Sequence, residues 1–401
     1  MKQRTIHKAS GAGIGILFAL SLAHLFNDMF QSVVTAVYPV IRDNLGLSFA
    51  QIGLITLIYQ ICASVFQPVF GVVFDKYPNP WYLAIGTTST LIGLVLLAYA
   101  GELWMVLVAV SFVGLGSSII HPEASKLTQY ASAGKHGLAQ SIFQVGGNLG
   151  SSIGPLLAAW IIAPYGQKYI VIFAGIALIS LLTKRPITQW YKERIDQVRR
   201  KTGTKEVIHR VRLSKKKIYF SLAVLLLLMF SKYVYTASLS SYYTFYLIEK
   251  FGLTTQQSQF FLFAYLFAAA AGTLLGGPIG DRVGRKWVIW FSILGTAPFA
   301  LMLPYANLFW TCVLSIVIGL VLSSAFSAIL VYAQELLPTK VGFISGLFFG
   351  LAFGIAGIAA AVLGSIADIR GIEYVYRMCA FMPLLGIVAV FLPNVRLNKN
   401  F

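Results

Sequence analysis

The stretch SLAHLFNDMFQS, residues 21–32, places polar side chains inside a segment that is otherwise apolar from residue 14 to residue 39. His24, Asp28 and Gln31 follow the i, i+4, i+7 spacing, so on a helix they share one face. An imidazole titrates near neutral pH, and burial favours the neutral form of a carboxyl group. We interpret Asp28 as a proton carrier, His24 as its modulator, and Gln31 as a residue that contacts the substrate.

A lysine lies at a similar depth in an apolar segment of the second half of the chain. Lys232 is about 14 residues into residues 218–246, as Asp28 is in its own segment, or roughly 21 Å along a helix. Tyrosine and threonine side chains form the expected polar face around it: Tyr235, Thr236, Tyr243 and Tyr246. Lys232 can attract an anionic substrate once Asp28 is protonated, or the two can form a static salt bridge.

Two further carboxylates lie near the ends of apolar segments. His121 and Glu123 occur in IIHPEASK, where we expect a second proton-binding site, and a pair of Glu123 with Lys126 is the alternative. Glu335 in AQELLP has the equivalent place in the second half, as a proton site or as a satisfied charge at a helix end. We expect no metal site, because no companion His or Cys occurs nearby in the sequence.

The composition indicates that lipid surrounds much of the chain. Hydrophobic residues make up 58% of the 401 positions and charged residues 11%, against roughly 25% charged residues in a soluble domain. Twelve apolar runs are long enough to span a membrane: residues 14–39, 50–73, 82–100, 103–124, 138–163, 169–184, 218–246, 257–279, 287–305, 308–332, 341–366 and 374–393. Continuous runs favour helices over alternating barrel strands. We therefore predict an all-α polytopic membrane protein.

Basic residues are distributed unevenly along the chain. Of 31 Lys and Arg residues, 25 fall in the termini and loops on one side of the twelve spans, and five fall on the other. This asymmetry predicts that both termini face the cytoplasm. Residues 184–217 hold 13 basic and 3 acidic residues, which we interpret as a linker near anionic lipid headgroups rather than a nucleic-acid-binding segment. The expected parts are a six-helix bundle of residues 1–184, a basic cytoplasmic linker of residues 185–217, and a second six-helix bundle of residues 218–401.

The two halves of the chain repeat one another. Gly71 matches Gly277 and Asp75 matches Asp281, both at an offset of 206 residues. The run HGLAQSIFQVGGNLG matches VGFISGLFFGLAFG at an offset of 205. A nearly constant offset through six spans predicts two equivalent bundles, an arrangement that in transporters forms a site near the middle of the membrane.

The run GGPIGDRVGRK, residues 276–286, resembles the loop signature of the major facilitator superfamily, G-x-x-x-D-[RK]-x-G-R-[RK]. GVVFDKYP, residues 71–78, resembles its copy in the first half, although the basic end of the signature is replaced by a Pro-Asn-Pro sequence. The resemblance implies a cytoplasmic gate motif formed by Gly71, Asp75, Lys76, Gly277, Asp281, Arg282, Gly284, Arg285 and Lys286. We expect the two aspartates to face basic side chains, whose contacts can hold the bundles together in one conformation. Glycine packing in a positively charged turn is the alternative.

A glycine-rich segment of the fifth span resembles the antiporter motif of drug–proton exchangers in this superfamily. GGNLGSSIGP contains Gly146, Gly147, Gly150, Gly154 and Pro155, and two alanines follow where the motif has glycines. Small residues at this spacing let another helix approach closely, and a proline bends the helix. Ordinary tight packing explains the glycines as well, so the antiporter role is implied by the resemblance.

Longer runs in both halves, among them LAHLFNDMFQS, SSIIHPEASK and SAFSAILVYAQELLP, are similar to bacterial members of the superfamily that confer resistance to fosmidomycin. This resemblance implies a monomeric transporter of the bacterial inner membrane that exports a small phosphonate antibiotic in exchange for protons. We expect the drug, protons and membrane lipids as partners, and neither a cofactor, nucleic acid nor enzymatic activity. The alternative is a proton-coupled importer or exchanger of a small anionic metabolite on the same fold.

Overall fold

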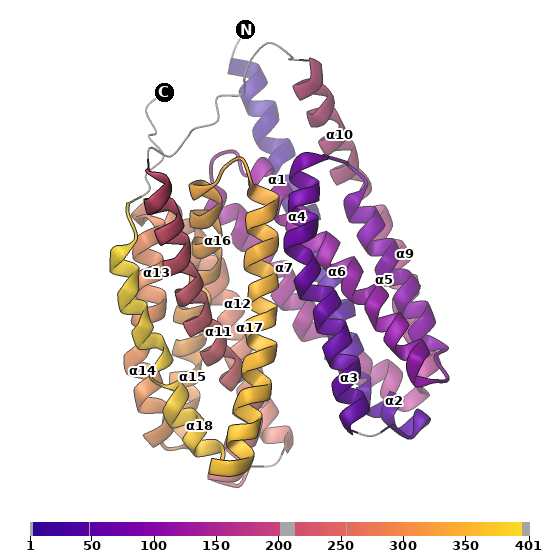
Figure 1. The fold of residues 1–401 in the computed structure, drawn as a ribbon, viewed down its shortest axis with the longest axis vertical. Helices are drawn as coiled ribbons and strands as arrows, with labels where there is room; N and C mark the ends of the chain where they lie inside the picture. The colour runs from indigo at the N-terminus through magenta and orange to yellow at the C-terminus, as the bar shows by residue number, and fades with distance from the viewer. Residues whose placement is uncertain (1–2, 48, 201–212, 254, 395–401) are drawn as a thin grey trace. The chain divides into compact units, whose positions relative to one another are not determined.

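The helices of the chain gather into two compact units (Figure 1). The computed structural model describes residues 3–47, 49–200, 213–253 and 255–394. Met1–Ile208 and Thr339–Leu351 form the first unit, and His209–Pro338 and Ala352–Phe401 form the second. The regular elements of the described residues are all helical, which confirms the predicted all-α fold class.

Long helices joined by short turns build the first unit. In chain order its helices are α1 (Gln3–Ala36), α2 (Tyr38–Leu45), α3 (Phe49–Gln60), α4 (Phe66–Lys76), α5 (Tyr82–Ala98), α6 (Leu103–Ala131), α7 (His136–Leu157), α8 (Ala163–Tyr165), α9 (Val171–Thr183) and α10 (Arg185–Arg200). Short π-helical segments at Ile61–Val65 and Ala158–Ile162 and a 3₁₀ turn at Gln167–Ile170 connect some of them. The first turns of α17 (Val341–Arg370) pack with this unit.

The second unit holds the remaining helices. They are α11 (Lys215–Phe251), α12 (Thr255–Val283), α13 (Arg285–Leu294), α14 (Ala297–Met302), α15 (Leu308–Ser323), α16 (Ala325–Leu336), the rest of α17, and α18 (Ile372–Cys379), with 3₁₀ segments at Leu303–Tyr305 and Met382–Phe391. Ser214 caps the start of α11 by accepting a hydrogen bond from the backbone N–H of Lys217. The helix ends at Gly252, whose φ of +68° favours glycine.

Nine helical stretches of the described residues are long and apolar enough to cross a membrane. They are Gly13–Val34, Leu54–Lys76, Leu103–Ala131, Gln167–Gln197, Lys215–Tyr243, Arg285–Tyr305, Leu308–Leu336, Val341–Ala367 and Ile372–Phe391. Each falls on one of the apolar runs expected from the sequence. The other three expected spans, residues 82–100, 138–163 and 257–279, fall on α5, α7 and α12. The chain is therefore a multi-pass membrane protein.

A helix lies within the basic segment that the sequence identifies as a linker. α10 buries Ile187 and Tyr191 and exposes most of its charged side chains, so it is amphipathic. Lys184 just before it is buried and donates to the carbonyl oxygen of Ser180. Residue 185 thus marks a change from an apolar helix to an amphipathic one. Residues 201–212 of the expected linker lie outside the described residues.

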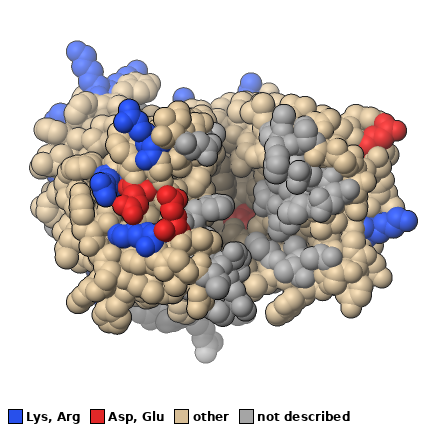
Figure 2. Space-filling model, turned by 90° about the horizontal axis from the view of Figure 1, so that it is seen from below, with Lys and Arg blue, Asp and Glu red and all other residues tan. Residues whose placement is uncertain are grey.

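The surface is largely uncharged on the face drawn in Figure 2. Lys and Arg atoms lie next to Asp and Glu atoms in one mixed cluster on this face, and a few other charges are isolated. This mixture of signs differs from the strongly basic character of residues 184–217.

Candidate functional site

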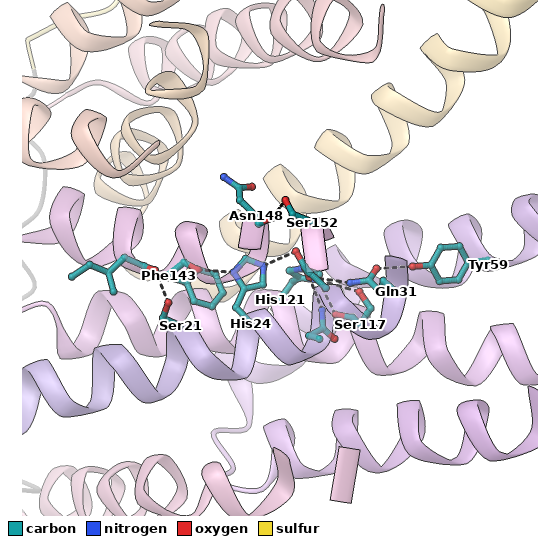
Figure 3. A network of polar contacts seen from close by, with 12 residues as sticks. Ser21, His24, Gln31, Tyr59, Ser117, His121, Phe143, Asn148 and Ser152 are labelled. Atoms are coloured by element: carbon teal, nitrogen blue, oxygen red, sulfur yellow. Dashed lines mark hydrogen bonds and ion pairs between the residues drawn. The ribbon is translucent and has the colours of Figure 1, made fainter. Parts of the chain in front are cut away.

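Asp28 lies in a buried cluster of polar side chains on α1 and α6 (Figure 3). Nε2 of His24 is 3.2 Å from Oδ2 of Asp28, and Nε2 of His121 is 3.1 Å from Oδ1. The side-chain amides of Asn27 and Gln31 donate to Oδ1 at 3.0 and 3.1 Å. Asp28 exposes only 8% of its surface, and the two imidazoles expose less. We refer to His24, Asn27, Asp28, Gln31 and His121 as the Asp28 cluster.

Backbone carbonyl groups fix the second nitrogen of each imidazole ring. Nδ1 of His24 lies 2.8 Å from the carbonyl oxygen of Phe143 on α7, and Nδ1 of His121 lies 3.1 Å from that of Ser117. Nδ1 of His121 also lies 3.1 Å from the hydroxyl oxygen of Ser117, which can donate or accept a hydrogen bond. A carbonyl or carboxylate oxygen only accepts, so a ring with a proton on both nitrogens donates to its carbonyl group and to Asp28 at once.

The cluster brings proton-binding atoms together in a buried place. An ionised carboxylate only accepts hydrogen bonds, so an Nε2 atom that carries a proton donates to Asp28. An Nε2 atom without a proton would face the carboxylate as a second acceptor at about 3.1 Å, which is unfavourable in a buried site unless a cation lies between them. The chemistry that this arrangement can perform is therefore the binding and release of cations, with protons as the simplest case.

Glycines of α7 lie directly against the cluster. A Cβ atom at Gly147 would be 2.5 Å from Cε1 of His24 and 2.7 Å from Oδ2 of Asp28. Cβ atoms at Gly146 and Gly150 would lie 2.0 and 2.1 Å from backbone carbonyl oxygens of α1. The predicted antiporter motif is thus the surface at which the α7 backbone approaches the polar face of α1.

The last part of that motif continues the same contact. A Cβ atom at Gly154 would lie 2.1 Å from Oγ of Ser32 on α1. Pro155 follows within α7, and its side chain lies outside the described ones. The helix then continues through the π-helical segment Ala158–Ile162, a conformation that often occurs at functional sites.

His121 does not share a site with Glu123, its neighbour in the sequence. The sequence groups it with Glu123 in a second site, but its ring is in the Asp28 cluster. Positions 121 and 123 are about 200° apart around a helix, so the two side chains point in different directions. The expectation that no companion ligands are near His121 is also wrong, because donor atoms of His24, Asp28 and His121 lie within 4.8 Å of one another.

Glu123 forms a buried ion pair with Lys126, which was the alternative considered for it. Nζ of Lys126 lies 2.6 Å from Oε2, and each side chain is 1% exposed. The same ammonium donates to the carbonyl oxygen of Phe74 and lies 5.8 Å from the ring centroid of Tyr191 on α10. A role of Glu123 in proton release remains a prediction.

Asp75 accepts hydrogen bonds from backbone amides rather than from basic side chains. The N–H groups of Gly342 and Phe343 donate to its carboxylate at 2.9 Å each. These amides belong to the first turn of α17, which has no acceptor within the helix and carries partial positive charge. The expected charge-assisted contact is thus made to a helix N-terminus. Gly71 packs on the same turn, whereas Lys76 is exposed.

The corresponding motif in the second unit forms a network of charged side chains. Arg285 lies 3.2 Å from Oδ1 of Asp281 and 2.9 Å from Oε1 of Glu335. Glu335, expected as a proton site or a satisfied helix-end charge, therefore shares its arginine with the gate motif. This ion pair accounts for its charge, and a proton-coupling role for it remains a prediction.

The other gate-motif residues of the second unit have separate environments. Lys286 donates to the carbonyl oxygen of Val390 at 2.7 Å, and Arg282 is exposed. Gly277 is buried within α12. Gly284 precedes α13 with a φ of +106°, a conformation that favours glycine over other residues.

Lys232 is buried next to aromatic rings of its own unit. Its side-chain nitrogen lies 5.2 and 5.3 Å from the ring centroids of Tyr233 and Phe326. No described carboxylate of the second unit lies within 4.0 Å of this nitrogen. Cation–π contacts offset part of the cost of burying the charge, and the ammonium N–H groups can still donate to an anion.

Tyr243 and Tyr246 lie further from Lys232 along α11, and their contact with a substrate stays a prediction. They are 11 and 14 residues beyond it in the chain, or roughly 16 and 21 Å along the helix. Both are buried, and their hydroxyl groups donate to the carbonyl oxygens of Thr311 and Leu303. These tyrosines therefore join α11 to neighbouring segments.

Tyr235 and Thr236 are closer to Lys232. They follow it by three and four positions, a spacing that places them on its side of the helix. Tyr235 is buried and Thr236 is partly exposed. Their contact with a substrate stays a prediction.

Sequence reasoning missed several residues of the site. The hydroxyl group of Tyr59 on α3 donates to Oε1 of Gln31 at 2.8 Å, and the ring of Phe143 stacks on His24 at a centroid distance of 4.0 Å. Phe143 lies four positions before Gly147, so the helical period of the glycine motif could have revealed it. No local signal points to Tyr59, because its contact depends on how α3 packs against α1.

Comparison with known proteins places this geometry in a family. The family model described as Major Facilitator Superfamily matches residues 20–258 and 224–400. The chain belongs to the major facilitator superfamily. Its fold and its relatives are those of transporters, so the predicted family is confirmed.

Relatives of this major facilitator occur in Escherichia coli and in Bacillus subtilis. The fosmidomycin resistance protein of Escherichia coli (strain K12) is 57% identical over 382 residues, which cover 95% of this chain and 93% of the relative. An uncharacterized MFS-type transporter of Bacillus subtilis (strain 168) is 38% identical over 98% of this chain and 96% of its own length.

Solved structures of major facilitators share the fold at low sequence identity. The transporter FucP in its outward conformation is 15% identical with a TM-score of 0.72, over 96% of this chain and 99% of its own. The human organic anion transporter MFSD10 is 12% identical with a TM-score of 0.75, over 95% of this chain and 99% of its own. These similarities concern the fold alone.

Proposed function

We propose that this major facilitator exports a small phosphonate antibiotic such as fosmidomycin in exchange for protons. The name of the Escherichia coli relative supports the substrate class. The buried Asp28 cluster is the observation that carries the proposal, because it holds groups that bind protons inside a multi-pass membrane protein. The sequence contains no G-x-x-x-x-G-K-[ST] nucleotide-binding loop, so the proposed energy source is the proton gradient.

Protons act in this proposal by changing the charge of the Asp28 cluster. With both Nε2 atoms protonated, His24, Asp28 and His121 together carry one net positive charge. Loss of two protons leaves one net negative charge and brings unprotonated acceptors face to face, which is unfavourable in a buried site. The closed cluster therefore retains its protons, and opening to the cytoplasm lets water accept them. Glu123 is the proposed next group on that path.

Lys232 has the proposed role of attracting the anionic drug. A phosphonate oxygen accepts strong hydrogen bonds from an ammonium group, and burial of Lys232 among aromatic rings strengthens such an interaction. In the proposed cycle, protonation of the Asp28 cluster removes its net negative charge, so that Lys232 binds the anionic drug. Gln31, Tyr235 and Thr236 are the other proposed contacts.

The membrane potential makes this exchange favourable. Export of one negative charge together with import of one proton moves two charges in the favourable direction, worth roughly 4.6 kcal/mol per 100 mV. Each unit of pH difference adds about 1.4 kcal/mol per proton. A modest gradient thus supports substantial accumulation of the drug outside the cell.

The proposed transport cycle uses two six-helix bundles, residues 1–184 and 218–401, which move by alternating access. Asp75 and the Asp281–Arg285–Glu335 network are the proposed cytoplasmic gate contacts, since each depends on a few hydrogen bonds that a movement can break. The protein is proposed to act as a monomer in the inner membrane with both termini in the cytoplasm.

Transport into inverted membrane vesicles tests the proposal. Vesicles containing the protein should accumulate labelled fosmidomycin when their interior is acidified, and a protonophore should abolish the accumulation. Asp28→Asn should lower proton-driven uptake at least about tenfold, because a buried amide cannot carry the proton. Glu373→Gln, which removes an exposed carboxylate, is the matched control and should transport normally. Uptake that does not respond to collapse of the gradient would refute the exchange mechanism.

The importer alternative predicts a different result in the same vesicles. A proton-coupled importer of a small anionic metabolite would not concentrate the drug inside acidified inverted vesicles. Drug accumulation in vesicles with an acidic interior, but not in vesicles with an alkaline interior, therefore distinguishes export from import.

A further inference from the structure

The Asp28 cluster has the donor set of a transition-metal site. One donor atom from each of His24, Asp28 and His121 lies within 4.8 Å of the other two, and all three residues are buried. Two imidazoles and one carboxylate are a ligand set that proteins use for Zn²⁺ with one position left open. A tetrahedral ion with bonds of about 2.0 Å needs its ligand atoms roughly 3.3 Å apart. Nε2 of His24 lies 3.2 Å from Oδ2 of Asp28 and Nε2 of His121 lies 3.1 Å from Oδ1, so each imidazole is at that spacing from one of the two carboxylate oxygens.

The groups around the imidazoles also match a metal site. Ligating histidines usually donate their other N–H to a carbonyl or carboxylate, which orients the ring and directs the lone pair of the ligating nitrogen. Nδ1 of His24 and Nδ1 of His121 lie at hydrogen-bond distance from the carbonyl oxygens of Phe143 and Ser117, the partners that such rings need. The Nε2 atom of each ring faces Asp28.

We propose that His24, Asp28 and His121 form a binding site for a divalent transition-metal ion, Zn²⁺ above all, which competes with protons for the same atoms. Imidazole nitrogens favour Zn²⁺ over Mg²⁺ or Ca²⁺, which prefer oxygen ligands. The ion is an inhibitor in this proposal, because it holds the cluster in one charge state.

The charge of the ligand set also suits a divalent ion. One Zn²⁺ with two neutral imidazoles and one carboxylate carries a net charge of plus one, so the ion offsets the negative charge of the buried Asp28. Metal binding itself does not require that the chain transport anything, although it uses the atoms proposed to couple transport to protons.

Zinc binding to the purified, tag-free protein tests this inference. Titration calorimetry in buffers of different ionisation enthalpy gives both the stoichiometry and the number of protons released, and X-ray absorption at the zinc edge identifies imidazole ligands. We expect one ion per chain and an affinity that falls at lower pH, because the ligating imidazole nitrogens must be without a proton. Zn²⁺ should also raise the unfolding temperature of the wild type.

Variants locate the ion. His24→Gln and His121→Gln should each weaken binding at least about tenfold, as expected for loss of a ligand. His136→Gln is the matched control, because His136 lies in the same unit and contacts Ser132 outside the cluster. Wild-type protein that binds no stoichiometric Zn²⁺ overturns the inference, and so do cluster variants that bind like the control.

Transport measured in parallel separates this inference from the proposed function. With a chelator present, drug–proton exchange should proceed normally, and added Zn²⁺ should inhibit the wild type. Exchange without any zinc binding refutes only the metal site. Zinc binding at the cluster without proton-driven transport refutes only the proposed function.

Discussion

At the scale of single residues, the site depends on two imidazoles and one carboxylate that are buried in contact with one another. Oδ1 of Asp28 receives amide hydrogen bonds from Asn27 and Gln31, which stabilise an ionised carboxylate. The Nε2 atoms of the two imidazoles approach the same carboxylate. Each proton gained or lost by an imidazole therefore changes the charge of the buried cluster.

A substitution at Gly147 tests whether the contact between His24 and Asp28 depends on the close approach of the α7 backbone. Gly147→Ala should reduce proton-driven drug uptake at least about tenfold, because the new methyl group would displace His24 and Asp28 from each other. Gly175→Ala on α9 is the control, since a Cβ atom there has nothing within 4 Å. Uptake and its dependence on pH should be measured at equal amounts of membrane protein. An alanine variant with the wild-type pH profile would contradict this role.

The pair of Glu123 and Lys126 is expected to act on stability as a unit. Lys126→Met should destabilise the protein by about 3–5 kcal/mol, because it leaves a buried carboxylate without its partner. The double variant with Glu123→Gln should recover much of that loss. Thermal unfolding in detergent measures both. Arg377→Met, which breaks an exposed pair with Glu373, should change stability by less than about 1 kcal/mol. Equal losses at the two pairs would show that burial does not set the cost.

At the scale of helices, the sequence predicts where a helix forms and which of its residues share a face better than it predicts the contacts between different helices. The helical spacing of His24, Asp28 and Gln31 correctly predicts a shared polar face, because that relation is set by the geometry of one helix. The partner of Asp75 could not be predicted in the same way. Its carboxylate binds amides 267 and 268 residues away, and backbone amides leave no trace in side-chain types.

The Asp75 contact should hold the start of α17 in place. Asp75→Ala removes the acceptor for two amides of the first turn, a loss typically worth about 0.5–2 kcal/mol at a helix N-terminus. Hydrogen exchange of residues 341–345 should therefore become faster, while exchange in α13 stays unchanged. In Asp281→Ala, exchange should become faster in α13 and stay unchanged at residues 341–345, because the carboxylate of Asp281 pairs with Arg285 at the start of α13. Unchanged exchange at α17 in the first variant would contradict the capping role.

At the scale of the whole molecule, composition and the internal repeat are strong signals because they sum over many residues. The apolar runs locate the spans without any knowledge of packing. The repeat offset also predicts that positions near 28 and 232 lie at similar depth in their bundles. It does not predict that His121 joins Asp28, because that depends on the packing of α6 against α1. Side-chain partners across helices are therefore the part that sequence alone leaves open.

The charge moved in one transport cycle gives the last prediction. If a singly negative drug leaves as one or more protons enter, the cycle carries net charge, and a membrane potential alone should drive it. A potential of 100 mV supplies about 2.3 kcal/mol per charge, so two charges correspond to an accumulation ratio of roughly 2,000-fold. Proteoliposomes with a potassium gradient and valinomycin, at equal pH on both sides, provide this condition. Drug movement should reverse when the sign of the potential is reversed. Transport that ignores the potential but follows a pH difference would contradict the exchange of an anionic drug for protons, because both movements carry charge in the same direction.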